Sequence, residues 1–106
     1  ALADGLTALR GATDWLLTNG MANPLDALAG ATPYLRLFSV VTGGWVMGRQ
    51  ALAASALLAD ASGDDKAFYE AKMLTARFFC EQLLPQANGL VPAITATNRD
   101  LAAATF

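Results

Sequence analysis

Apolar residues recur every three or four positions over most of this chain, which is the spacing of one face of an α-helix. Residues 2–18 show this pattern first, and Asn19-Gly20 follows as a helix-stop signal. Asn23-Pro24 then forms a helix start, with Asn as the N-cap and Pro at the first helical position. The pattern therefore predicts one helix over 2–18 and a short second helix over 24–29.

The longest uninterrupted helical pattern runs from about residue 33 to residue 60. Thr32 is the predicted N-cap, and Pro33 takes the first helical position. At a rise of 1.5 Å per residue such a helix spans about 42 Å, which is long for a domain of this size. Its predicted packing stripe consists of Tyr34, Phe38, Val41, Trp45, Gly48, Leu52, Ser55 and Ala59.

The next break lies at 62–65, where Asp64 or Asp65 is expected to cap a helix that runs to about Leu84. Pro85 is expected to end or kink that helix, and 86–96 again favour helix. The predicted apolar face of the helix before Pro85 consists of Tyr69, Met73, Ala76, Cys80 and Leu83, widened by Phe68, Phe78 and Phe79.

A last short helix is predicted over 99–104, with Asn98 as its cap. No alternating pattern typical of a β-strand lies between turn signals. The predicted fold is all-α, an antiparallel helical bundle of about four main helices in a single domain over residues 1–106.

The composition is more apolar than that of an ordinary free-standing domain. Hydrophobic residues make up 55% of the chain and charged residues 15%, against roughly a quarter charged in typical globular chains. The mean hydropathy is +0.38. We therefore expect another domain or subunit to cover part of the outer surface.

The charge and the apolar runs exclude two classes of partner. The net charge is −2 and the basic residues are scattered, so no basic stripe is available to bind nucleic acid. The uncharged run over 37–48 is shorter than the roughly 20 residues that a transmembrane helix needs. Cys80 is the one cysteine and cannot form an internal disulfide, which fits a reducing compartment, so a cytoplasmic location is expected.

Few residues in the chain could carry out chemistry. There is no His, which removes the commonest general base and the commonest metal ligand. Glu70 and Glu81 each have a basic residue four positions away, Lys66 and Arg77, and are interpreted as solvated ion pairs. Cys80 is interpreted as a small buried hydrophobic residue. We expect no catalytic residue, cofactor site or metal site within these residues.

The candidate functional residues are therefore packing and interface residues. Gly44 and Gly48 form a small-xxx-small pair that would let another helix approach closely. Arg36 and Arg49 are embedded in apolar sequence, as are two basic residues of the later helix. Each basic residue either lies at the exposed edge of an amphipathic helix or pairs with an acid at an interface. The full candidate set is Tyr34, Arg36, Phe38, Gly44, Trp45, Gly48, Arg49, Lys72 and Arg77.

Several runs carry a resemblance to a known family. They are NPLDALAGATPYLRLF over 23–38, Gly43-Gly44-Trp45, FYEAK over 68–72, TARFF over 75–79 and LLPQA over 83–87. With these runs the chain resembles the C-terminal domain of a branch of the acyl-CoA dehydrogenases, which includes the 3-methylmercaptopropionyl-CoA dehydrogenases.

The resemblance implies a parent enzyme that uses FAD to oxidise an acyl-CoA to its 2-enoyl form. In that family the flavin, the acyl-CoA pocket and the catalytic glutamate belong to preceding domains. The resemblance therefore implies that this chain is a C-terminal fragment that packs on those domains, in an enzyme expected to be a homo-oligomer. The alternative is an autonomous helical module that self-associates and has no catalytic activity.

Overall fold

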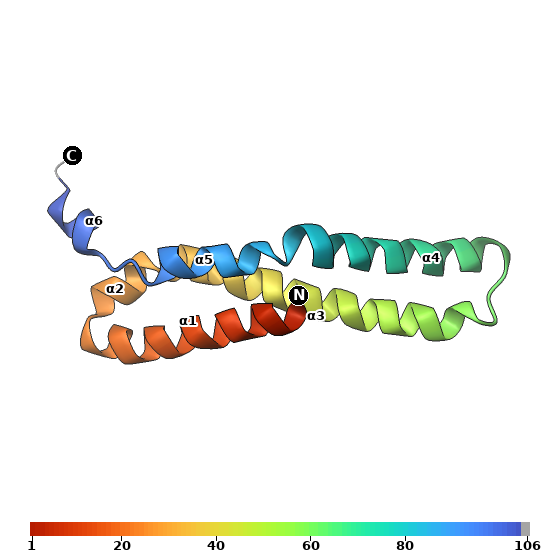
Figure 1. The fold of residues 1–106 in the computed structure, drawn as a ribbon, viewed down its shortest axis with the longest axis horizontal. Helices are drawn as coiled ribbons and strands as arrows, with labels where there is room; N and C mark the ends of the chain where they lie inside the picture. Colours follow the sequence, from red (N-terminus) through yellow and green to blue (C-terminus); the bar gives the residue numbers. More distant parts are fainter. Residues whose placement is uncertain (105–106) are drawn as a thin grey trace.

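The computed structural model describes residues 1–104, and within them helices are the only regular elements (Figure 1). The all-α prediction is thus confirmed. The elements in chain order are α1 (Leu2–Ala22), α2 (Pro24–Ala29), α3 (Ala31–Leu58), α4 (Gly63–Phe78), the π-helical turn η1 (Phe79–Leu83), α5 (Gln86–Ile94) and α6 (Arg99–Ala103).

The helices form a long hairpin that a further helix covers along only part of its length. Helix α3 runs in one direction, while α4, η1 and α5 follow one another back along it (Figure 1). Helix α1 lies beside α3 and α5 and begins near the middle of α3, so the far half of the hairpin has only two helices. The molecule measures 62 × 28 × 15 Å, with a radius of gyration of 18.5 Å. A compact chain of this length has a radius of about 13 Å, so this one is markedly elongated.

The hydrophobic core lies at the three-helix end. The largest fully buried side chains are Leu37 of α3, Leu84 directly after η1, and Ile94 of α5. Burying a side chain of this size stabilises a fold by about 1.5–3 kcal/mol. The core cluster consists of Ala12, Leu37, Val41, Leu84, Ala87 and Ile94.

The long helix predicted over 33–60 is confirmed, although it begins two residues earlier, at Ala31. The predicted cap at Thr32 is wrong, because Gly30 precedes the helix and its carbonyl accepts the backbone N–H of Tyr34 at 3.0 Å. Gly30 is needed here for a close approach. A Cβ at this position would lie 2.6 Å from the carbonyl oxygen of Ile94, so only glycine lets the α2–α3 junction contact the end of α5.

The predicted end of the first helix at Asn19-Gly20 is wrong, since α1 continues to Ala22. The Asn19 carbonyl accepts the backbone N–H of Asn23 at 2.7 Å, which completes the last turn. Pro24 comes next and has no N–H to donate, so the helical hydrogen bonding stops at that point. Pro24 therefore ends the helix, and it also occupies the first position of α2 as predicted.

The predicted caps at Asp64 and Asp65 are also wrong. Ser62 occupies the N-cap position of α4, and both aspartates lie in the first turn, where their charge suits the helix dipole. The helix-breaking role of Pro85 is confirmed in a specific form. The N–H of Leu84 bonds to the carbonyl of Phe79 at 2.9 Å, five residues back, so one wide turn precedes the proline before α5 continues.

The packing stripe predicted for the long helix lies on a different side of α3 from most of the residues that are buried. Phe38, Trp45 and Leu52 were expected to face the bundle, but they are 48%, 51% and 75% exposed. Nearly every position in this part of α3 is apolar, so the pattern is compatible with either face. The buried positions of α3 are Leu37, Val41, Gly44 and Ala54.

The two glycines of α3 differ in what surrounds them. A Cβ on Gly44 would lie 3.0 Å from a methyl carbon of Leu84, whereas a Cβ on Gly48 would meet nothing within 4 Å. Within the described residues, Gly44 thus has a close neighbour from another helical segment, whereas the space beside Gly48 is open.

This difference gives a matched pair of substitutions. In the 106-residue chain, Gly44→Leu should lower the free energy of unfolding by about 1–3 kcal/mol, because the new side chain overpacks against Leu84. Gly48→Leu should raise it by roughly 0.5–1 kcal/mol, because leucine favours a helix over glycine and the space is open. Urea denaturation followed by circular dichroism measures both changes. Equal effects of the two substitutions would contradict this packing.

Candidate functional site

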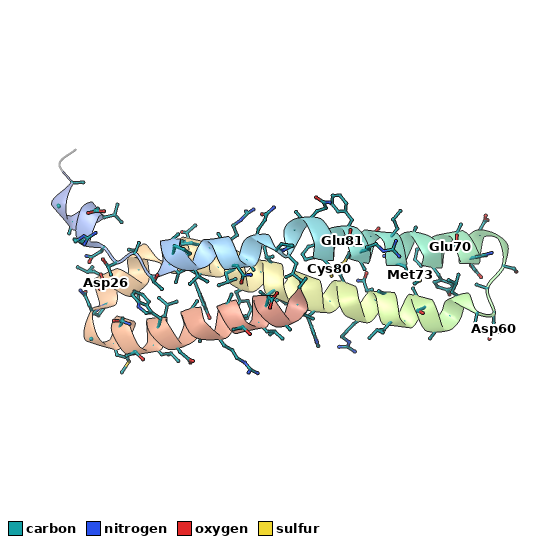
Figure 2. The ribbon with its side chains drawn as sticks, viewed as in Figure 1. Asp26, Asp60, Glu70, Met73, Cys80 and Glu81 are labelled. Carbon is teal, nitrogen blue, oxygen red and sulfur yellow. The ribbon has the colours of Figure 1, made fainter. Side chains whose placement is uncertain are left out.

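The acidic side chains and the cysteine do not gather into a reactive site. Asp26, Asp60, Glu70 and Glu81 are spread along the whole length of the molecule (Figure 2). Within residues 1–104, no three His, Cys, Asp or Glu side chains lie close enough to hold a metal ion. Cys80 is a half-buried free thiol that packs against the hydrophobic core.

Asp26 instead has a structural contact. Its carboxylate accepts the backbone N–H of Asn98 at 2.8 Å, from a residue far away in the sequence. This bond joins the first turn of α2 to the start of α6, which otherwise extends away from the bundle (Figure 1). Asp26 therefore positions the C-terminal segment.

Tyr34 faces the bundle, as expected, and its hydroxyl has a defined partner. Thr13 of α1 donates its hydroxyl hydrogen to the carbonyl of Leu9 at 2.7 Å. The 2.7 Å contact between the Thr13 and Tyr34 hydroxyls must then be donated by Tyr34, because the threonine has only one hydrogen to give. This bond joins α1 to α3 next to the core.

The four basic candidates have no acidic partner in the described chain. The one ion pair among residues 1–104 joins Arg99 and Asp100, whose side chains are 82% and 93% exposed. The expected pairs of Glu70 with Lys66 and of Glu81 with Arg77 are therefore wrong: they do not approach within 4 Å in the part of the chain that is described.

Two of the basic side chains cover aromatic rings instead. The Arg49 guanidinium lies 5.0 Å from the centre of the Trp45 ring on α3. The Lys72 ammonium lies 5.4 Å from the centre of the Phe68 ring on α4. Both pairs have the same spacing of four residues, which brings side chains together on one side of a helix. These are cation–π contacts, one on each of the two long helices of the hairpin.

These two pairs belong to one continuous surface, which we call the Trp45–Phe68 face. A shallow groove on α3 and a second groove between α3 and α4 meet there, since Gln50 and Ala53 line both. The residues that line the two grooves are Trp45, Val46, Arg49, Gln50, Ala53, Ala54, Leu57, Phe68, Tyr69 and Lys72.

Arg36 and Arg77 lie elsewhere on the hairpin. Arg36 donates to the side-chain carbonyl of Gln86 at 3.4 Å, at the three-helix end. Arg77 lines a separate shallow groove together with Glu70 and Leu74. Of the nine candidate residues, Trp45, Arg49 and Lys72 line the two adjoining grooves. Tyr34 and Phe38 contact each other elsewhere, with their ring centres 6.3 Å apart.

Several residues of this face were not predicted from the sequence. Phe68 was expected to widen the buried face of its helix, but it is 57% exposed. The same expectation was wrong for Phe78, which lines neither groove and is 59% exposed. Leu57 and Val46 were not singled out, although both are exposed on the same face. The sequence does contain one signal that could have indicated this face: an aromatic residue stands four positions before a basic residue in both helices.

The structure defines a class of protein. It is an elongated helical domain whose described buried side chains are all apolar and whose exposed surface is rich in large hydrophobic residues. None of the helices among residues 1–104 combines the length and hydrophobicity that a membrane crossing requires. A domain of this class has large apolar surfaces that are available for packing.

The chain belongs to the acyl-CoA dehydrogenase C-terminal family, since residues 1–105 match the family model described as acetyl-CoA dehydrogenase C-terminal like. The resemblance noted in the sequence is thereby confirmed. The chain is 36% identical over 105 residues to a 3-methylmercaptopropionyl-CoA dehydrogenase of Ruegeria pomeroyi. The aligned region covers 99% of this chain and 18% of that protein.

A second relative is the broad-specificity linear acyl-CoA dehydrogenase FadE5 of Mycobacterium tuberculosis. It is 32% identical over 107 residues, covering 94% of this chain and 18% of that protein. The chain thus spans 18% of the length of each of these two relatives. No solved structure matches the chain significantly.

The hydrogen bond between α1 and α3 can be tested directly. Tyr34→Phe should lower the free energy of unfolding by about 0.5–1.5 kcal/mol, because it removes the donor to Thr13 and leaves the ring in place. Tyr69→Phe is the matched control, since the Tyr69 hydroxyl has no hydrogen-bond partner among residues 1–104, and it should change stability by less than about 0.5 kcal/mol. Thermal denaturation of both variants gives the comparison, and an unchanged Tyr34→Phe would rule out a stabilising bond.

Proposed function

We propose that residues 1–106 form one appended domain of an FAD-dependent acyl-CoA dehydrogenase whose reaction takes place in the preceding part of the same polypeptide. The parent enzyme oxidises an acyl-CoA to its 2-enoyl form, with FAD as the immediate oxidant. Family membership and the names of the two relatives, both acyl-CoA dehydrogenases, support this proposal.

Within that enzyme the domain has a structural role: it packs against the catalytic body. The observation that carries this proposal is the exposed surface of 7112 Å². A compact protein of this mass exposes about 5,600 Å², so the chain exposes roughly 1,500 Å² more than a self-contained domain. One side of a standard protein interface buries about 800 Å², so the excess is sufficient for a substantial contact.

The residues of this chain do not fit a flavin site. FAD carries phosphates and a ring with polar edges, and its binding requires several converging polar groups. The side chains buried among the described residues are all apolar, and the grooves are shallow and lie on the surface. We therefore assign the flavin, the acyl-CoA and the catalytic base to the preceding domains, and no residue here to the chemistry.

The candidate residues named from the sequence fall into two groups, those that pack inside the domain and those that are exposed for contact with the parent enzyme. Tyr34 and Gly44 hold the helices of the domain together. Gly48 has open space beside it. The residues that we propose for the interface with the parent enzyme are Arg36, Phe38, Trp45, Arg49, Lys72 and Arg77.

We propose in addition that the parent enzyme is a cytoplasmic homo-oligomer. The exposed apolar surface supports contacts between subunits as well as between domains. The free thiol of Cys80 fits a reducing compartment. An autonomous self-associating module is the second candidate, and the same exposed surface supports it. It predicts that the gene encodes no flavoprotein body before Ala1.

Flavin content separates the two parts of the enzyme. The full-length polypeptide should purify with bound FAD and lose its yellow colour when an acyl-CoA substrate reduces it. The 106-residue chain expressed alone should carry no flavin, because it lacks converging polar groups. The visible absorption spectrum of each purified protein measures the result. Stoichiometric flavin on the 106-residue chain would contradict the assignment.

A further inference from the structure

The Trp45–Phe68 face is uncovered on a part of the molecule that has little core of its own. The two-helix end of the hairpin extends beyond α1 (Figure 1). Among the described residues of this end, Ala54 and Ala76 are the buried ones, and both side chains are small. Trp45, Leu57 and Phe68 are each more than half exposed. The aromatic and aliphatic side chains of this face therefore stay in contact with water.

The face has a definite charge as well as an apolar character. Arg49 and Lys72 contribute two positive charges, and none of the residues that line the two grooves is acidic. Each cation lies over an aromatic ring, at 5.0 Å for Arg49 and 5.4 Å for Lys72. A partner for this face has to cover the rings and also supply carboxylates for two cations that lack acidic neighbours.

A second copy of this face does not meet that requirement. In a two-fold dimer the same patch meets itself, so Arg49 and Lys72 of one copy would face the same cations of the other. Like charges brought together in an interface oppose association. The charge pattern therefore favours a different surface, one that is apolar and acidic.

We propose that the Trp45–Phe68 face is covered by an amphipathic, carboxylate-bearing segment of the same polypeptide, from the region that precedes Ala1. This inference rests on the proposed function, since it assumes a parent enzyme. The chain spans 18% of the length of its relatives, so most of such an enzyme lies outside these residues. A segment tethered to the domain acts at an effective concentration of about millimolar, which favours it over a separate protein for a shallow surface.

Photo-cross-linking in the full-length enzyme tests the proposal. A benzophenone-bearing amino acid replaces Phe68, and a second variant carries it at Leu74, which is exposed on the same helix but lines a different groove. The expected result at position 68 is an intramolecular cross-link. Mass spectrometry should place it in a peptide before Ala1 that contains Asp or Glu.

Three other cross-linking results would contradict the proposal. A cross-linked dimer at position 68 would show that a second copy covers the face and would overturn the proposal. Cross-links to the catalytic body from position 74 alone would overturn it and leave the proposed packing function intact. The absence of cross-links to the catalytic body from both positions would contradict the proposed function as well.

Charge reversal provides an independent measurement. In the Phe68 cross-linking background, Arg49→Glu combined with Lys72→Glu should abolish the intramolecular cross-link, because both cations would repel the carboxylates once reversed. Lys66→Glu is the matched control on the same helix, since Lys66 lines neither groove, and it should keep the cross-link. Lys72→Arg should keep it as well. Retention of the cross-link in the double variant, with circular dichroism unchanged, would overturn the charge pairing.

Discussion

The position of Leu84 between two glycines is the contact on which the three-helix end depends. A Cβ on Gly44 would lie 3.0 Å from this side chain, and a Cβ on Gly5 of α1 would lie 3.3 Å from it. The absence of side chains at both positions lets α1, α3 and the α5 segment meet around one buried leucine. The wide turn η1, which accommodates Pro85, comes directly before Leu84 and sets its direction. The packing of the core around Leu84 therefore depends both on the two glycines and on the wide turn before Pro85.

This contact lies at one end, and among residues 1–104 the far half of the hairpin consists of α3 and α4 alone. Its helices hold each other through small residues, while large apolar side chains remain on the surface. The elongated shape follows from this uneven distribution. The large apolar side chains that this half leaves exposed are available for contact with another surface.

Much of the fold could be predicted from the sequence, because breaks in a helical chain are local events. Proline and glycine act through the backbone at their own positions, so the short helix before Gly30, the long helix after it and the change at Pro85 were all predicted. The candidate face was harder to predict. Basic residues in apolar surroundings drew attention to Arg49 and Lys72, but the exposure of Phe68 and Leu57 depends on which helices cover them.

The sequence by itself determined the helical class, the approximate helix ends and the family, since these depend on residue spacing and on recognisable runs. Only the tertiary structure decided which face of the long helix is buried. Apolar residues surround almost the whole first half of α3, so helical periodicity permits more than one rotation. The contact of Leu84 with Gly44 selects one of them. Phe38 and Trp45 are consequently directed to the surface, where a packing partner can reach them.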